Sequence, residues 1–257
     1  MISSRLLFFR DFINGKNMLI SVKHNFVFLC MPKCASTSSE TMLLPHSDIV
    51  IVGTPPLRHT NLREYERSIK PFIVEKTGKD TLETVCLIRE PVSWLYSWYR
   101  FRARAELRNP NHPAHNNSTH GVSFLEFVEA YVSKNKPAFA DVGCQYDMLR
   151  NEAGENGVEK VFCYNQVNVF VDYMSAKVGK KLILGSENVS PKSIHQNNSI
   201  ELISSIMRKV MNRLKVEHRV VEKDMSKEIP RPLMTALREN IRQDFEVYER
   251  AKNNRFA

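Results

Sequence analysis

Short apolar runs alternate along the chain with longer stretches that have helical spacing. Four apolar runs predict buried strands, at residues 25–31, 48–52, 82–88 and 159–164. Helical spacing or helix-starting residues predict helices at residues 36–44, 62–76, 92–107, 123–133, 142–151, 167–178, 200–221 and 232–251. Residues 1–18 form no clear pattern. Strands alternating with helices predict one α/β domain over residues 1–257, with a mostly parallel central sheet flanked by helices.

The composition is that of a folded globular chain, because 42% of the 257 residues are hydrophobic and 25% are charged. No run reaches the roughly 20 apolar residues that a transmembrane helix needs. Charged residues near the start, such as Arg5 and Arg10, interrupt any signal-peptide core. Five cysteines without a CxxC pair predict neither a disulfide framework nor a zinc site, and Cys30 and Cys86 are expected in the core. A cytoplasmic protein is expected.

The net charge of +9 predicts a polyanionic partner, such as a nucleotide, a nucleic acid, a membrane surface or an acidic substrate. A solvated helix face explains clustered basic residues equally well. The tightest cluster contains Arg100, Arg102, Arg104 and Arg108.

The loop between the first two predicted elements is the strongest chemical motif. Residues 32–38, here called the PKCASTS loop, join the strand at 25–31 to the helix at 36–44. A loop that ends a buried strand and enters a helix presents backbone N–H groups to an anion. It is not a Walker A loop, since the GK[ST] ending is absent. An ordinary capped turn remains the alternative. The candidate anion ligands are Lys33, Cys34, Ala35, Ser36, Thr37 and Ser38.

A second strand–loop–helix unit adds a guanidinium. Arg89 follows the strand at 82–88, and with Glu90 and Pro91 it forms the segment here called the REP motif. Ser93 and Ser97 lie four residues apart on the following helix and therefore share a face. An arginine and a helix hydroxyl are suited to a phosphate. Alternatively, Arg89 pairs with Glu90 or caps the helix, and Ser97 is a packing residue.

Together, the two motifs resemble the sulfotransferases that use 3′-phosphoadenosine 5′-phosphosulfate (PAPS), in particular the carbohydrate-type branch and its bacterial relatives. That family has a P-K-x-G-T-T-like loop for the 5′-phosphosulfate and an R-[DE]-P-x-x-x-x-x-S segment for the 3′-phosphate. The resemblance implies a fold like that of the P-loop nucleotide kinases, with Arg89 and Ser97 at the 3′-phosphate. Residues 244–248 show a weaker similarity to the same family. Ala35 departs from the family glycine, and we expect its φ to be negative.

The resemblance also implies a reaction. An acceptor hydroxyl attacks the sulfur of PAPS in line, and adenosine 3′,5′-bisphosphate leaves. Lys33 is suited to the leaving oxygen, and His59, whose free imidazole has a pKa of about 6.5, is the candidate base. No metal is expected, because the loop histidines at 109–121 lack an acidic or cysteine partner. Rival bases are His112, His115, His120 and Glu40.

The expected acceptor is a glycan or another small polyhydroxylated molecule, because the basic segment at 100–108 precedes a polar loop. A homo-oligomer is compatible with the sequence. One alternative function is an ATP-dependent kinase or other phosphotransferase, against which the missing GK[ST] argues. Another is a basic nucleic-acid-binding domain, although no motif of that class is present and no nucleic-acid partner is expected.

Overall fold

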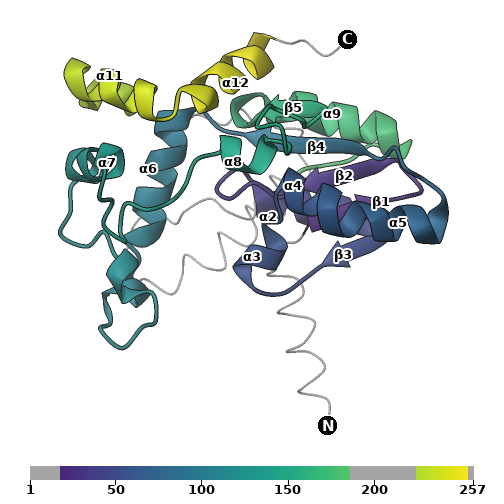
Figure 1. The fold of residues 1–257 in the computed structure, drawn as a ribbon, viewed down its shortest axis with the longest axis horizontal. Helices are drawn as coiled ribbons and strands as arrows, with labels where there is room; N and C mark the ends of the chain where they lie inside the picture. Colours follow the sequence, from purple (N-terminus) through teal and green to yellow (C-terminus); the bar gives the residue numbers. More distant parts are fainter. Residues whose placement is uncertain (1–17, 186–223, 254–257) are drawn as a thin grey trace, which may run out of the picture.

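A computed structural model describes residues 18–185 and 224–253, which form a single α/β domain around a five-stranded sheet (Figure 1). The predicted helix at 200–221 lies outside the described residues. The strand order across the sheet is β3-β1-β2-β4-β5. The strands are β1 (Met18–Ser21), β2 (Phe26–Leu29), β3 (Ile49–Ile51), β4 (Glu83–Ile88) and β5 (Lys160–Cys163).

The sheet is mostly but not wholly parallel. β2 pairs with β4 and β4 with β5 in parallel, whereas β1 is antiparallel to both of its neighbours, β2 and β3. Four strands therefore run in one direction, and only β1 runs against them. The sequence did not predict β1, which forms a hairpin with β2. Asn25 supports the hairpin turn with a φ of 57°, a conformation that asparagine tolerates better than most residues.

The helices fill the chain between the strands. They are α2 (Ser36–Leu43), α3 (Pro55–Arg58), α4 (Leu62–Glu64), α5 (Lys70–Thr77), α6 (Pro91–Arg102), α7 (Phe124–Val132), α8 (Tyr146–Leu149), α9 (Val167–Val178), α11 (Arg231–Asn240) and α12 (Arg242–Asn253). A π-helical segment, η2 (Tyr65–Ile69), joins α4 to α5. Short 3-10 turns are η1 (Leu44–His46), η3 (Ala105–Arg108), η4 (His115–Asn117), η5 (Tyr164–Gln166) and η6 (Ser226–Glu228).

Three predicted helices are shorter or broken. α6 ends at Arg102 instead of residue 107, because the backbone turns extended at Arg104 (ψ 147°). The helix expected at 142–151 is reduced to α8, since Gly143 has a φ of 68°. The helix expected at 232–251 divides into α11 and α12 at Ile241, whose φ of −124° is not helical. In the segment 62–76, the π-helical turn precedes Pro71, which has no N–H to donate.

Aromatic side chains attach helices to the sheet and to one another. Phe170 of α9 packs against Phe28 of β2 and Phe162 of β5, with ring centroids 5.6 Å apart in both pairs. Tyr96 of α6 meets Phe124 of α7 edge to face at 5.1 Å. Figure 1 shows α6, α7 and α11 gathered beside the sheet, with α12 leading back toward β5. The carboxyl ends of β2 and β4 therefore face the start of α6.

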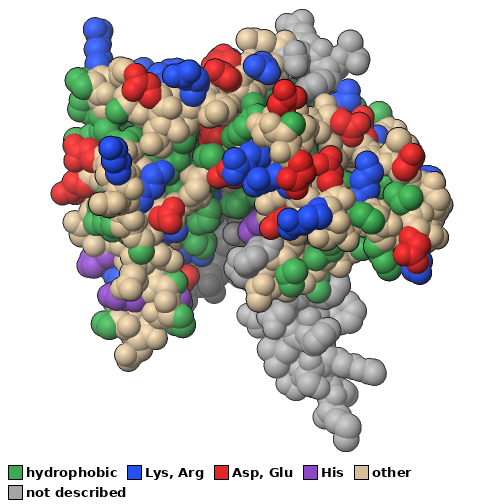
Figure 2. All heavy atoms as spheres, viewed as in Figure 1, with side chains coloured by type: hydrophobic (Ala, Val, Ile, Leu, Met, Phe, Trp, Pro, Cys, Tyr) green, Lys and Arg blue, Asp and Glu red, His purple; other side chains and the backbone are tan. Residues whose placement is uncertain are grey.

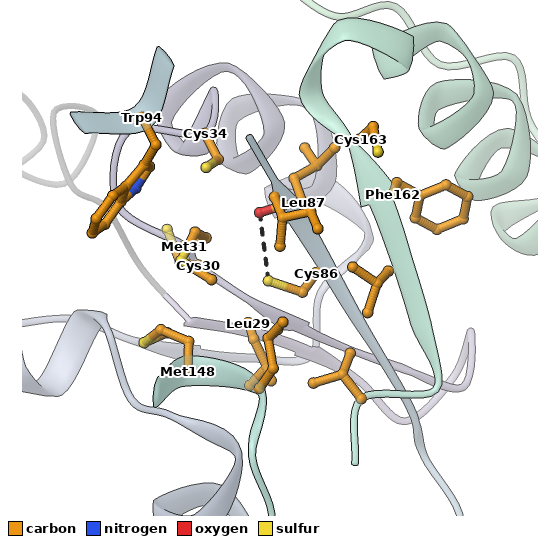
Figure 3. Packing of buried hydrophobic residues seen from close by; sticks show 14 of the residues in the cluster. Leu29, Cys30, Met31, Cys34, Cys86, Leu87, Trp94, Met148, Phe162 and Cys163 are labelled. Carbon is orange, nitrogen blue, oxygen red and sulfur yellow. Dashed lines mark hydrogen bonds between the residues drawn. The ribbon is translucent and has the colours of Figure 1, made fainter. Parts of the chain in front are cut away.

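All five cysteines are free thiols, and Cys30 and Cys86 are fully buried as expected. Figure 3 shows Cys30, Met31, Cys34 and Cys86 close together at the carboxyl ends of β2 and β4, with Trp94 beside them. Burial raises the pKa of the Cys86 thiol, so this residue is a packing group. Within residues 18–185 and 224–253, no helix is both long enough and apolar enough to cross a membrane.

Candidate functional site

The PKCASTS loop leaves β2 and bends sharply before α2 begins. Lys33 has a φ of 66° and Ala35 a φ of 53°, whereas Cys34 between them does not have a positive φ. Left-handed residues next to right-handed ones can turn successive backbone N–H groups toward one side, an arrangement that is suited to an anion. The expectation of a negative φ at Ala35 was wrong. A non-glycine residue costs about 1–2 kcal/mol in this left-handed conformation, so Ala35 stores strain.

The start of α2 provides further donors to the same loop. Ser36 and Ser38 are buried, with 4% and 6% of their surface exposed, and Thr37 is half-buried. Ala35 is the residue before the helix and makes no side-chain cap. The first-turn N–H groups and the positive end of the α2 dipole therefore lie at the PKCASTS loop.

The REP motif begins α6 at the same edge of the sheet. The Glu90 carboxylate caps the helix by accepting from the Ser93 N–H at 2.7 Å. The Arg89 Nε donates to Ser93 Oγ at 3.0 Å. Ser97, the predicted phosphate ligand, lies one turn further along the same face and is half-buried. The Arg89 guanidinium also lies 5.0 Å from the ring centroid of Tyr164.

Two contacts bring the PKCASTS loop and the REP motif together. The Arg89 Nη1 donates to the Lys33 carbonyl at 3.4 Å, and the buried Trp94 Nε1 of α6 donates to the Pro32 carbonyl at 2.9 Å. These two contacts join residues that are separated by 56 and by 62 positions in the sequence. The Lys33 ammonium lies 4.0 Å from the centroid of Phe101 on α6. Both cations proposed as anion ligands are therefore held at the interface between the loop and α6.

His59 lies at this edge as well. It follows α3, and its Nδ1 is 2.6 Å from the carbonyl oxygen of Cys30, the residue after β2. A carbonyl only accepts, so Nδ1 carries the proton in the neutral ring and the lone pair lies on Nε2. β3 runs in the same direction as β2, which is why the chain after β3 returns to the edge that carries the PKCASTS loop.

The rival bases have different surroundings. His112 Nδ1 accepts from the Ala114 N–H at 3.1 Å, and His115 Nδ1 is 3.0 Å from the Leu107 carbonyl. Both contacts remain within the segment between α6 and α7. His120 is exposed, and Glu40 is buried on α2 with 3% of its surface exposed.

The arginine cluster after Arg100 does not form one basic surface. Arg102 is buried and donates to the carbonyls of Ala138 and Asp141 at 2.6 and 2.8 Å, and burial lowers its pKa. The Arg104 guanidinium lies 4.2 Å from the Phe101 centroid. On the face seen in Figure 2, Lys and Arg side chains alternate with Asp and Glu, and the surface is hollowed between the α6–α7 part and the part with α2 and α3.

Sequence reasoning missed two buried residues that contact this edge. Gln145 bonds to the backbone of Arg89, and Asp244 of α12 bonds to the backbone of Gln145. Burial raises the pKa of Asp244 to about 6, although two backbone N–H groups donated to it act in the opposite direction. Only the weak family similarity at 244–248 pointed to Asp244. Gln145 gave no local signal, because its partners are 56 and 99 residues away.

Within the described residues, no group of three or more His, Cys, Asp or Glu side chains is arranged to hold a metal ion. No protein-family model matches the chain, and neither the curated proteins nor the solved structures include a match.

We expect the substitution Ala35→Gly to raise the free energy of unfolding by about 1 kcal/mol, because glycine adopts a positive φ without the Cβ clash. Urea denaturation measures the change. The same substitution at Ala130 in α7, a regular helix, should lower the free energy by about 1 kcal/mol. Destabilisation of equal size at both positions would contradict the left-handed conformation of Ala35.

We expect Asp244 to make stability depend on pH. Its folded-state pKa of about 6 lies above the ordinary value of 3.8, so the folded state binds the proton more tightly. Its contribution is complete below about pH 4 and is lost as the pH rises through about 6, a change of about 3 kcal/mol. Urea titrations from about pH 4 to about pH 7 measure it. The isosteric variant Asp244→Asn should lack this part of the slope, and identical slopes would refute the assignment.

Proposed function

We propose that the protein is a PAPS-dependent sulfotransferase that transfers a sulfuryl group to an acceptor hydroxyl. The observation that carries this proposal is the contact between the two anion motifs, in which Arg89 donates to the Lys33 carbonyl at 3.4 Å. A donor with phosphate groups at both its 5′ and 3′ positions needs two anion sites, one at each of these motifs. The proposal also includes a fold related to that of the P-loop nucleotide kinases.

The residues at the sheet edge are chemically suited to such a donor. The backbone of the PKCASTS loop and the start of α2 are suited to the 5′-phosphosulfate, because N–H groups and the helix dipole stabilise negative charge. Arg89 is suited to the 3′-phosphate, because a guanidinium presents five N–H donors in a planar fork that matches the geometry of a phosphate. When bound, PAPS supplies the sulfuryl group and a phosphate leaving group.

Two side chains have separate roles in the proposed transfer. His59 removes the proton from the acceptor hydroxyl through Nε2, because its contact with the Cys30 carbonyl keeps the proton on Nδ1. Lys33 supplies positive charge to the leaving oxygen. The Lys33 ammonium lies over Phe101, so a cation–π contact holds it near the end of α6.

The proposed acceptor is a glycan or another polyhydroxylated molecule. Fewer basic side chains are available to bind an acceptor than the sequence suggested, because Arg102 donates to backbone carbonyls inside the fold. Arg100, Arg104 and Arg108 are exposed on this segment, and the Arg104 guanidinium lies 3.7 Å from the Glu106 carboxylate. A polar rather than a strongly anionic acceptor fits this arrangement.

We expect Lys33→Ala and Arg89→Ala each to weaken the binding of adenosine 3′,5′-bisphosphate by about 1.5–3 kcal/mol, the range for hydrogen bonds to charged groups. Isothermal titration calorimetry measures the affinity. The variant Arg242→Ala, which removes an exposed arginine at the start of α12, is the matched control and should bind like the wild type. If Lys33→Ala and Arg89→Ala bind as tightly as the control, the site assignment is wrong.

We expect His59→Ala to lower turnover by about 10²–10⁴, the usual contribution of a positioned base, with bisphosphate affinity nearly unchanged. The assay follows transfer from radiolabelled PAPS to a panel of glycan and small polyhydroxylated acceptors. His115→Ala is the matched control, because it also removes an imidazole that contacts a carbonyl through Nδ1. Loss of turnover in His115→Ala or Glu40→Gln, with retention in His59→Ala, would reassign the base.

A further inference from the structure

A single buried amide contacts both the PKCASTS loop and the REP motif. Gln145 has 2% of its surface exposed. Its Oε1 accepts from the Arg89 N–H at 2.8 Å and from the Cys34 Sγ at 3.6 Å, and its Nε2 donates to the Arg89 carbonyl at 2.8 Å. The reversed amide would place two donors against each other at Arg89, so this orientation is the one that the contacts require.

The position of Arg89 explains why such an amide is needed. β4 pairs with β5 as far as Ile88, opposite Cys163, and Arg89 is the next residue. The sheet therefore does not extend to the peptide groups of Arg89, which are half-buried and must find partners elsewhere. The side chain of Gln145 supplies one donor and one acceptor in the arrangement of a neighbouring strand. It fixes the backbone from which the Arg89 guanidinium extends.

The amide is itself held from the C-terminal helix α12. Both carboxylate oxygens of Asp244 accept backbone N–H groups, from Gln145 at 2.9 Å and from Tyr146 at 2.8 Å. Asp244 has 2% of its surface exposed, and bonds of this kind to a carboxylate are stronger than neutral ones. On the other side of Gln145, the carbonyl of Gly143 accepts from the Tyr131 hydroxyl at 2.7 Å. The segment that carries Gln145 is thus fixed at both ends.

We propose that Gln145 and Asp244 are positioning residues for the 3′-phosphate site, with Asp244 holding Gln145 and Gln145 holding Arg89. This inference rests on the proposed function, because it assigns Arg89 to the 3′-phosphate. Neither residue touches the donor. Both act by fixing the backbone of Arg89 relative to the PKCASTS loop, where Gln145 also contacts Cys34. A positioned guanidinium discriminates ligands with the 3′-phosphate from those without it.

The test compares two ligands on the full chain. The quantity measured is the affinity for adenosine 3′,5′-bisphosphate divided by that for adenosine 5′-monophosphate. Gln145→Met keeps the length of the side chain but removes its hydrogen bonds, and we expect this ratio to fall about tenfold, the equivalent of about one hydrogen bond. The affinity for the monophosphate should fall less than the affinity for the bisphosphate, because Gln145 makes two bonds to Arg89 and one long contact to Cys34. Gln166→Met, at an exposed glutamine after β5, is the matched control.

A double-mutant cycle separates positioning from general destabilisation. If Gln145 acts through Arg89, the substitution Gln145→Met should change the ratio by less than about twofold in an Arg89→Ala background. An equal fall of the ratio in both backgrounds would overturn the inference. Asp244→Asn provides a second variant if Gln145→Met does not fold. It should lower the ratio, because an asparagine offers only one acceptor to the two N–H groups, whereas Glu246→Gln on the same helix should leave the ratio unchanged.

Hydrogen exchange tests the positioning without any ligand. The Arg89 amide should exchange faster in Gln145→Met than in the wild type, because its acceptor has been removed, whereas amides within α9 should not change. Unchanged exchange at Arg89 would refute the positioning role. If exchange rises but the wild type does not prefer the bisphosphate, the contact is correct and the proposed function is wrong. The two failures are therefore distinguishable.

Discussion

The parallel pairing of β2 with β4 is the constraint on which the rest of the site depends. With Leu29 opposite Cys86, both strands end at the same edge, and the PKCASTS loop and Arg89 emerge side by side. The positive φ angles of Lys33 and Ala35 persist because surrounding contacts hold the loop. Trp94 and Arg89 both donate to its carbonyl oxygens. The antiparallel strand β1 lies on the other side of β2 and leaves this edge intact.

Sequence periodicity predicted the parts of the fold that rest on local interactions. α9 matches its predicted range, and α7 begins after Ser123, which forms a capping box with Glu126. The predictions fail where contacts between residues distant in the sequence determine the local structure. All four residues of β1 are buried, so its sequence shows no alternation of polar and apolar positions. Its antiparallel direction is determined by pairing with β2 and β3, which no local sequence pattern predicts. The predicted helix at 142–151 starts only at Tyr146, after Gly143 with its positive φ, and Asp244, about 100 residues later, accepts the N–H groups of Gln145 and Tyr146 at its start.

The candidate site was predictable to the extent that each residue lies next to a strand end. Arg89 directly follows β4 and Lys33 lies four residues after the end of β2, and their meeting follows from the order of parallel strands. The role of Arg102 was not predictable, because a basic residue on a helix looks the same whether it faces solvent or buried carbonyls. The role of Gln145 was not predictable either, because nothing in the sequence distinguishes it from other polar residues. Only the fold places its amide between the two motifs.

The proposed function requires the sheet edge to bind a nucleotide that carries a 3′-phosphate. The most direct measurement is a parallel calorimetric titration of the unmodified chain with adenosine 3′,5′-bisphosphate, with ATP and magnesium, and with DNA or RNA at several salt concentrations. We expect the bisphosphate to bind more tightly than ATP with magnesium, and we expect no strong binding of nucleic acid. Tighter binding of ATP with magnesium would favour a phosphotransferase, and strong salt-sensitive binding of nucleic acid would favour a nucleic-acid-binding protein. Either result, without binding of the bisphosphate, would contradict a 3′-phosphate site at the sheet edge.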